Sequence, residues 1–551
     1  MSSTNSLSTF SRNETLQRAE TIRFDILVIG GGITGAGIAL DAASRGMQVA
    51  LIEKNDFASG TSSRSTKLIH GGLRYLKQFE FALVSEVGKE REILYRNAPH
   101  IVYPENMLLP IIEHGSLGRL TTAIGLSIYD WLAGVSFSER KQMLSRRATL
   151  RREPLLRKDI LLGGALYKEY RTDDARLVIE VMKTAAGFGA ACMNYVEANE
   201  FIYKDGTVIG ASVTDNLEGK KTDIHARITI NAAGPWVDHL RAKDHSLHGK
   251  KLHLTKGVHI VIPYSRMPIK QAVYFDVPDG RMVFAIPRGK TTYIGTTDTN
   301  YFDSPDEPAV TKEDAAYLIN AVNFMFPSVQ LTMDDIVSSW AGLRPLIHEE
   351  GKAPSELSRK DEIFVSSTGL ISIAGGKLTG YRKMAERVVN LAAEKLADLD
   401  GMSFKNCFTD KIKLSGGDFK DKYELMEYLE MLQQQYARSS ADRDILTELV
   451  YRYGSNTETL LNSAARAGHL PDRKTLLEAE LLYGLQHEAV TSLSDFLIRR
   501  TGRLYFDRHS IMDDYALLEE KIASALSWDV TRRKMYDSAF RKVYEAAVNF
   551  S

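Results

Sequence analysis

The sequence has little cysteine, no excess of charge of either sign and no long apolar run. Its 551 residues include two cysteines, Cys192 and Cys407, which lie far apart and belong to no CxxC pair. A disulfide framework and a structural zinc site are therefore not expected. Lys and Arg together number 70, as do Asp and Glu, so the net charge gives no reason to expect nucleic acid as a partner.

Targeting and membrane-spanning segments are also lacking. The longest uncharged apolar run near the start, residues 26–40, is too short to span a bilayer and is broken by glycines. Residues 1–20 are polar and have no apolar signal-peptide core. We therefore expect a disordered tail over residues 1–20 and a cytoplasmic protein.

Two kinds of hydrolytic or metal motif are missing as well. His487-Glu488 begins like the zinc-binding pattern HExxH, but position 491 is Thr, so no metal site is expected. No Ser-His-Asp arrangement or GxSxG motif is visible.

What the sequence does contain is a complete βαβ unit near its start. Residues 24–29 (FDILVI) form an apolar run typical of a buried parallel strand, residues 33–45 follow helical spacing and residues 48–53 (QVALIE) form a second strand. This order predicts an α/β domain with a parallel sheet.

Three glycines and one carboxylate in this unit predict a dinucleotide site. Gly30, Gly32 and Gly35 occupy the strand-to-helix turn as GxGxxG, and Glu53 ends the second strand. Glycine permits the tight turn, the approach of backbone N–H groups to a pyrophosphate and the close packing of helix on strand. Glu53 would accept hydrogen bonds from the ribose and would repel a 2′-phosphate, which disfavours NADP.

Two later strands favour FAD over NAD. Residues 224–231 lead into Ala-Ala-Gly-Pro-Trp at 232–236, and residues 369–376 end in Gly375-Gly376 before Lys377 and a long helix. Both strands are expected to return to the parallel sheet and bring chain close to the cofactor. The helix after Gly376 would direct its positive end towards a reduced isoalloxazine.

The rest of the chain divides into a sheet-forming part and a helical part. Runs at 259–263, 282–287 and 292–296 predict a mixed or antiparallel sheet above the substrate. From about residue 415 helical periodicity continues to the end. We predict an FAD-binding domain over 21–414, with an interleaved substrate-binding domain mainly at 80–170 and 240–345, and an α-helical C-terminal domain over 415–551.

Five segments give the sequence a family resemblance. They are TSSRSTKLIHGGLRY at 61–75, NAAGPW at 231–236, GTTD at 295–298, GLRP at 342–345 and GGKLTGYR at 375–382. In order and spacing the chain resembles the FAD-dependent (aerobic) glycerol-3-phosphate dehydrogenases, and DFLIRRT at 495–501 is similar to the family's C-terminal domain. The resemblance implies a doubly wound, amino-acid- and amine-oxidase-like FAD fold, with oxidation of sn-glycerol 3-phosphate to dihydroxyacetone phosphate and electron transfer through FAD to a quinone.

The resemblance also implies the site residues. The substrate-contacting positions are Arg74, Tyr75, Thr296, Arg344, Arg359 and Lys377. The FAD-contacting positions beyond the glycine motif and Glu53 are Thr61, Ser62, Ser65, Lys67, His70, Gly71, Ala233, Gly234, Trp236, Gly376, Leu378 and Thr379.

The chemistry divides roles among these residues. A phosphate dianion needs fixed cations, and we place Arg344 and Lys377 at the reacting end and Arg74 and Arg359 near the phosphate. Arg344 would stabilise the developing alkoxide. His259 and His70 are the two candidate bases, and we favour His259, with His70 beside the flavin; a hydrogen-bonded core histidine is the alternative for His259. Arg359, in a charged loop, has an exposed ion pair as its alternative.

Several questions stay open from the sequence. Oxygen could replace quinone as acceptor, another substrate such as an amino acid could occupy the same scaffold, or the protein could bind flavin without turnover; a homodimer is one alternative for the oligomeric state. The apolar stretch 120–137 and the following basic cluster 138–158 suggest peripheral attachment to an anionic surface on the inner face of the plasma membrane. An ordinary core helix followed by a solvated basic loop is the alternative.

Overall fold

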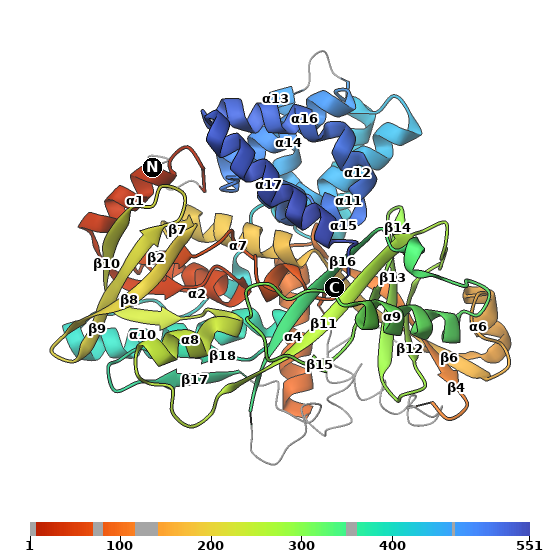
Figure 1. Cartoon of the computed structure of the whole chain (residues 1–551), viewed down its shortest axis with the longest axis horizontal. Helices are drawn as coiled ribbons and strands as arrows, with labels where there is room; N and C mark the ends of the chain where they lie inside the picture. Colours follow the sequence, from red (N-terminus) through yellow and green to blue (C-terminus); the bar gives the residue numbers. More distant parts are fainter. Residues whose placement is uncertain (1–6, 70–80, 116–140, 349–360, 465–468, 551) are drawn as a thin grey trace.

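Two sheets lie beside each other, and a helical domain lies over both (Figure 1). The computed structural model describes residues 7–69, 81–115, 141–348, 361–464 and 469–550. The first sheet has eight strands and the second has ten.

The first sheet is built around the predicted βαβ unit. Its parallel strands follow the order β18 (Ile371–Ala374), β10 (Lys221–Asn231), β1 (Arg23–Ile29), β2 (Val49–Glu53) and β7 (Ala191–Asn194). Antiparallel β17 (Glu362–Val365) extends one edge, and β9 (Thr207–Asp215) pairs with both β10 and β8 (Val196–Lys204). The strands predicted at 24–29, 48–53 and 224–231 all end at the predicted residue.

Alternation along β1 explains why helices cover both faces of this sheet. Ile26 and Val28 pack into a core with α2 (Ile33–Ser44), α7 (Asp174–Gly187) and α10 (Tyr381–Asp400). Leu27 and Ile29 face the other way, into a core shared with α1 (Arg12–Thr21) and α8 (Val237–Lys243). Residues of a strand alternate between faces, so both faces are buried and the predicted doubly wound fold is confirmed.

The second sheet is mixed, as predicted. Its path runs β15 (Thr299–Asn300), β11 (Leu252–Pro263), β14 (Thr291–Gly295), β13 (Met282–Arg288), β12 (Ala272–Asp276), β4 (Val102–Ile112), β6 (Leu161–Thr172) and β3 (Leu68–Ile69). β16 (Ser338–Ile347) pairs with β11, and β5 (Gln142–Ser145) pairs with β6. Helix α4 (Phe81–Asn97) precedes β4, and α6 (Arg146–Arg152) follows β5.

Alternate residues of β11 point to opposite faces of the second sheet. Val258, Ile260 and Ile262 are buried in a core with α9 (Lys312–Met325). His259 and Val261 point to the opposite face, where Val261 packs in a core with residues of the helical domain. The histidine of the predicted strand is thus placed away from α9.

The C-terminal part is helical, as predicted, and appears in blue in Figure 1. It comprises α11 (Lys422–Tyr436), α12 (Ser440–Tyr453), α13 (Thr457–Ala464), α14 (Arg473–His487), a π-helical turn (Asp495–Arg500), α15 (Arg503–Phe506), α16 (Arg508–Ala525) and α17 (Val530–Ala546). Among the helices of the described residues, none is long and apolar enough to cross a membrane.

The prediction of a loose tail over residues 1–20 is wrong for its second half. Residues 12–21 form α1, and Arg12 donates to both carboxylate oxygens of Asp215, at 3.0 and 2.8 Å, and to the carbonyl of Asn194 at 2.8 Å. The polar composition of the tail could not predict this buried ion pair, because the partner of Arg12 is 203 residues away.

Candidate active site

The glycine turn after β1 has the geometry that a dinucleotide requires. Gly30 has φ of 119°, and a Cβ there would lie 2.5 Å from the carbonyl oxygen of Ala232 at the end of β10. A Cβ on Gly35 would overlap the carbonyl of Gly30. Gly32 caps α2, and a Cβ on it would meet only Ser62. Positions 30 and 35 therefore admit no side chain, and the turn leaves backbone available to a phosphate.

Glu53 is fixed beside this turn. Its carboxylate accepts from the backbone N–H of Gly31 at 2.7 Å and from that of Asn55 at 3.0 Å. Burial raises the pKa of Glu53 above its ordinary value, while these two backbone donors act to lower it. The carboxylate is thus fixed between the end of β2 and the glycine turn.

The two later strands reach the same edge of the sheet. β10 pairs with β1 and β18, so Ala233-Gly234 and Gly375-Gly376 both follow neighbouring strand ends. Both Gly375 and Gly376 have positive φ, of 77° and 82°, and a Cβ on Gly376 would overlap Met384. The parallel pairing of β10 with β1 and β18 confirms the prediction that both strands return to the parallel sheet.

A cavity of about 190 Å³ lies where the two sheets meet. Nine predicted site residues line it: Thr61, Ser62, Ser65, His259, Arg344, Gly376, Lys377, Leu378 and Thr379. Its other lining residues include Ile33 of α2, Arg64, Thr66, Asp174 and Gly257. The cavity thus extends from the start of α2 to the second sheet.

His259 is buried against this cavity, with 1% of its surface exposed. Its Nε2 lies 3.0 Å from the hydroxyl of Thr66, whereas its buried Nδ1 has no hydrogen-bond partner among the described residues. Burial, together with the charges of Arg344 and Lys67, lowers the pKa of His259 well below its ordinary value. The imidazole is therefore neutral at pH 7 and able to accept a proton.

Arg344 is held in a defined orientation on β16. Nη2 donates to the hydroxyl of Thr296 at 3.0 Å, and Nη1 donates to Asp298 at 3.1 Å and to the carbonyl of Thr297 at 3.3 Å. A Cβ on Gly257 would overlap the guanidinium. Glycine at position 257 is therefore required for Arg344 to lie across β11.

Two predicted cofactor residues lie against a buried aspartate. Asp174, at the start of α7, accepts from the backbone N–H and the hydroxyl of Ser65 at 2.9 and 2.7 Å, and it forms an ion pair with Lys67. Lys67 is also within 5.5 Å of the Trp340 ring centre. Asp174 thus fixes the segment that carries Ser65, Thr66 and Lys67 beneath the cavity.

Comparison with known proteins identifies the chain. The family described as FAD dependent oxidoreductase matches residues 25–382, and the C-terminal domain of alpha-glycerophosphate oxidase matches residues 407–533. The aerobic glycerol-3-phosphate dehydrogenase of Bacillus subtilis (strain 168) is 49% identical over 547 residues, covering 98% of each chain. That of Staphylococcus aureus (strain MRSA252) is also 49% identical, over 545 residues and 98% of each chain.

The chain belongs to the aerobic glycerol-3-phosphate dehydrogenase family. It is an FAD-dependent oxidoreductase, as the resemblance implied.

Solved structures agree with membership of this family. The glycerol-3-phosphate dehydrogenase from Bacillus halodurans complexed with FAD is 44% identical, has a TM-score of 0.84 and covers 98% of this chain and 99% of its own. An L-alpha-glycerophosphate oxidase from Mycoplasma pneumoniae with FAD bound is 19% identical, with a TM-score of 0.55 over 70% of this chain and 96% of its own. At that identity the second likeness shows the shared fold alone.

Some of the predicted site residues do not line the cavity, and others lie outside the residues that the structure describes. Arg74, Tyr75, His70, Gly71 and Arg359 lie outside the described residues, as does the apolar stretch 120–137. Trp236 follows β10 as predicted, but its indole N–H donates to Asp306 at 2.9 Å, and Lys54 lies over its ring.

Other residues of the site were missed by sequence reasoning. Thr66 and Arg64 lie inside the quoted segment 61–75, which was the available signal. Asp298, which binds Arg344, likewise lies inside the quoted segment 295–298, whereas Trp340, which stacks on His259, needed the strand register to be found. Among the described residues, no group of three or more His, Cys, Asp or Glu could hold a metal ion.

Proposed function

We propose that this chain oxidises sn-glycerol 3-phosphate to dihydroxyacetone phosphate and passes the electrons to a quinone. The observation that carries the proposal is the 49% identity, over 98% of each chain, to a relative named for this substrate. The cavity supports it, because cationic and neutral basic side chains converge there: Arg344, Lys377 and His259.

We infer that the glycine turn holds the pyrophosphate of FAD and that Glu53 binds its ribose. The absence of room for side chains at Gly30 and Gly35 fits this placement. Segment 61–67 and residues 376–379, with Ala233, Gly234 and Trp236, would bring chain to the rest of the cofactor. Bound FAD would supply the acceptor of the hydride from C2 of the substrate.

The substrate is proposed to lie in the cavity, with its phosphate held by cations. Arg74 and Arg359 are proposed to hold the phosphate, with Tyr75 beside them. Arg344 and Lys377 are proposed to lie at the reacting end, where Thr296 orients Arg344 through its hydroxyl. An amino-acid substrate would not account for a group of cations suited to a phosphate, so we favour the phosphate ester.

The proton of the substrate hydroxyl is proposed to go to neutral His259. Removal of this proton leaves negative charge on the oxygen, which Arg344 would stabilise at close range until the hydride leaves C2 and the C=O bond forms. Thr66 holds Nε2 of His259, and Trp340 lies along its ring. These two neighbours would keep the base in one orientation throughout the reaction.

The electron acceptor has two candidates. Quinone is proposed because the similar relatives are named dehydrogenases. Oxygen is the second candidate, because the helical domain matches the domain described from alpha-glycerophosphate oxidase.

One assay separates the two acceptors. Purified enzyme is given sn-glycerol 3-phosphate in air, with and without a soluble quinone analogue, and peroxide is measured. Quinone reduction at least tenfold faster than peroxide formation supports the dehydrogenase. Stoichiometric peroxide with no acceleration by the quinone would establish the oxidase.

A further inference from the structure

The segment that follows Glu53 connects the dinucleotide turn to the helical domain. Ala58 donates its backbone N–H to the carbonyl of Gly31 at 3.0 Å. Phe57 is fully buried, and a Cβ on Gly31 would lie 2.8 Å from its ring. Residues 54–60 therefore pack directly on the turn that Glu53 also contacts.

Asp56 anchors this segment from the other side. Its Oδ2 accepts from Nη1 of Arg500 at 2.7 Å and from Nε of Arg499, and its Oδ1 accepts from Nη2 of Arg500 at 2.8 Å. The side chains of Asp56 and Arg500 are both 0% exposed. Burial acts to raise the pKa of Asp56, but the charges of Arg500 and Arg499 outweigh it and lower that pKa to about 2.

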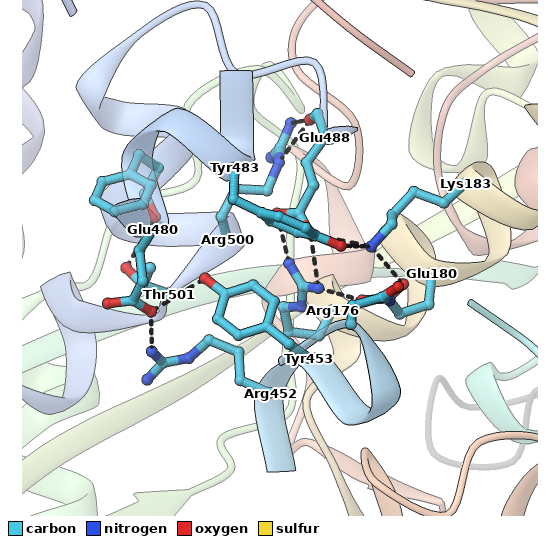
Figure 2. A network of polar contacts seen from close by, with 12 residues as sticks. Arg176, Glu180, Lys183, Arg452, Tyr453, Glu480, Tyr483, Glu488, Arg500 and Thr501 are labelled. Atoms are coloured by element: carbon cyan, nitrogen blue, oxygen red, sulfur yellow. Dashed lines mark hydrogen bonds and ion pairs between the residues drawn. The ribbon is translucent and has the colours of Figure 1, made fainter. Parts of the chain in front are cut away.

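The two arginines belong to the π-helical turn Asp495–Arg500 of the helical domain, which is itself held by further hydrogen bonds. Arg500 also donates to the carbonyl of Glu488 from Nε and Nη2, at 2.9 and 2.7 Å. The Glu488 carboxylate accepts from Arg176 of α7 at 2.7 and 2.9 Å. Figure 2 shows Arg500 and Glu488 from the helical domain meeting Arg176 in one network.

The ion pairs of Asp56 with Arg499 and Arg500 fix the position of segment 54–60 more than they add to the free energy of unfolding. A buried ion pair contributes little net stability compared with apolar packing of the same volume. A bidentate guanidinium–carboxylate pair does, however, fix the distance and angle between two elements. Here the fixed carboxylate is three residues after the proposed ribose ligand Glu53.

We propose that Arg499 and Arg500 are positioning residues for FAD: by holding Asp56 they keep Glu53 and Gly31 in the geometry that binds the ADP half of the cofactor. The inference rests on the FAD placement proposed above and is independent of the substrate and the electron acceptor. Coupling between two binding events is reciprocal. Bound FAD must therefore stabilise the docking of segment 488–501 on the FAD domain.

The test compares FAD dissociation constants of two arginine variants. Arg500→Met removes the anchor. Arg452→Met is the matched control, because Arg452 pairs with buried Glu480 at 2.6 Å inside the helical domain (Figure 2) and not with Asp56. We expect Arg500→Met to raise the dissociation constant at least tenfold and Arg452→Met to leave it within twofold, even where both lower the thermal midpoint equally. A dissociation constant within twofold for folded Arg500→Met, or equal weakening by both variants, would overturn the proposal.

Hydrogen exchange on the unaltered protein provides a test that needs no variant. Removal of FAD should increase amide exchange at 54–60 and at 488–501, but not at 445–453 of α12. Unchanged exchange at 488–501 would contradict the coupling. Glu53→Arg separates the two ideas: full flavin content in that variant would disprove the FAD placement, whereas flavin lost from Glu53→Arg but retained by Arg500→Met would disprove the coupling alone.

Discussion

The imidazole of His259 lies on the indole of Trp340, with ring centroids 4.8 Å apart and planes inclined by 12°. The two residues are paired across β11 and β16. The Trp340 indole N–H donates to the carbonyl of Ser65 at 3.3 Å, and Thr66 binds the histidine at Nε2. The ring plane and one nitrogen of His259 are therefore both fixed.

We predict that the depressed pKa of His259 sets the pH dependence of turnover. A base acts only when unprotonated, and a lowered pKa keeps His259 unprotonated to more acidic pH. We predict that kcat/KM stays constant as the pH falls to about 6.5, the ordinary value for histidine, and declines only below it. An acid limb centred above pH 6.5 would show that another group controls the proton transfer.

Removing the base should affect chemistry and leave the cofactor in place. His259→Asn is expected to lower kcat about 100-fold or more, the usual contribution of a positioned general base, and to abolish the acid limb. Flavin content, measured by absorbance, should match that of the wild type. A kcat within tenfold of wild type would mean that His259 is a core residue.

Glycine at position 295 is predicted to be essential because His259 occupies the space where its side chain would lie. A Cβ there would overlap Cδ2 of the imidazole across the β11–β14 pairing. Gly295→Ala should therefore lower kcat at least tenfold while the protein stays folded and retains FAD. Gly187→Ala is the control, since a Cβ at Gly187 would meet nothing within 4 Å, and its kcat should equal that of wild type.

Arg344 is predicted to act on the transition state. Arg344→Ala should lower kcat/KM by roughly 100- to 1,000-fold, as for loss of one oxyanion-stabilising donor, and should leave the protein yellow. Arg344→Lys keeps the charge without the fork and should lie between. Arg266→Ala, which removes an exposed ion pair with Asp335, serves as control. Turnover of Arg344→Ala within about tenfold of wild type would refute the role.

The order of the elements could be predicted because each followed from local pattern. The strand at 24–29, the glycine turn and Glu53 are close in sequence, and periodicity with glycine spacing was enough to place them. The tail helix α1 was missed, because the partner of Arg12 is Asp215. Local composition carries no information on such a distant pair.

The residues of the site also fall into those that the sequence predicted and those that it did not. His259, Arg344 and Lys377 were chosen from chemistry and resemblance, and all three line one cavity. Trp340 was not chosen, because an isolated tryptophan in a strand gives no signal until the register puts it opposite His259. Asp56 was missed for a further reason: its partners Arg499 and Arg500 are 443 and 444 residues away.

Attachment to a membrane surface is predicted to use the basic helix α6. Arg147, Arg151 and Arg152 are exposed on it, and each cation near an anionic bilayer contributes about 1 kcal/mol. We predict that the protein co-sediments with anionic but not with neutral vesicles, and that replacing Arg146, Arg147, Arg151 and Arg152 by Ser weakens this binding. The control replaces exposed lysines of the helical domain by Ser, at Lys420, Lys422, Lys474 and Lys534. If the control loses binding and the α6 variant does not, the attachment surface is on the helical domain.

The most direct measurement is the absorbance of the bound flavin when sn-glycerol 3-phosphate is added without oxygen. An enzyme that transfers hydride from this substrate must reduce its own FAD, so we predict that the yellow colour bleaches within the dead time of mixing or shortly after, and that glycerol lacking the phosphate leaves it unchanged. Subsequent addition of a quinone analogue should restore the oxidised spectrum. Flavin that stays oxidised with sn-glycerol 3-phosphate, yet is bleached by dithionite, would contradict the proposed reaction.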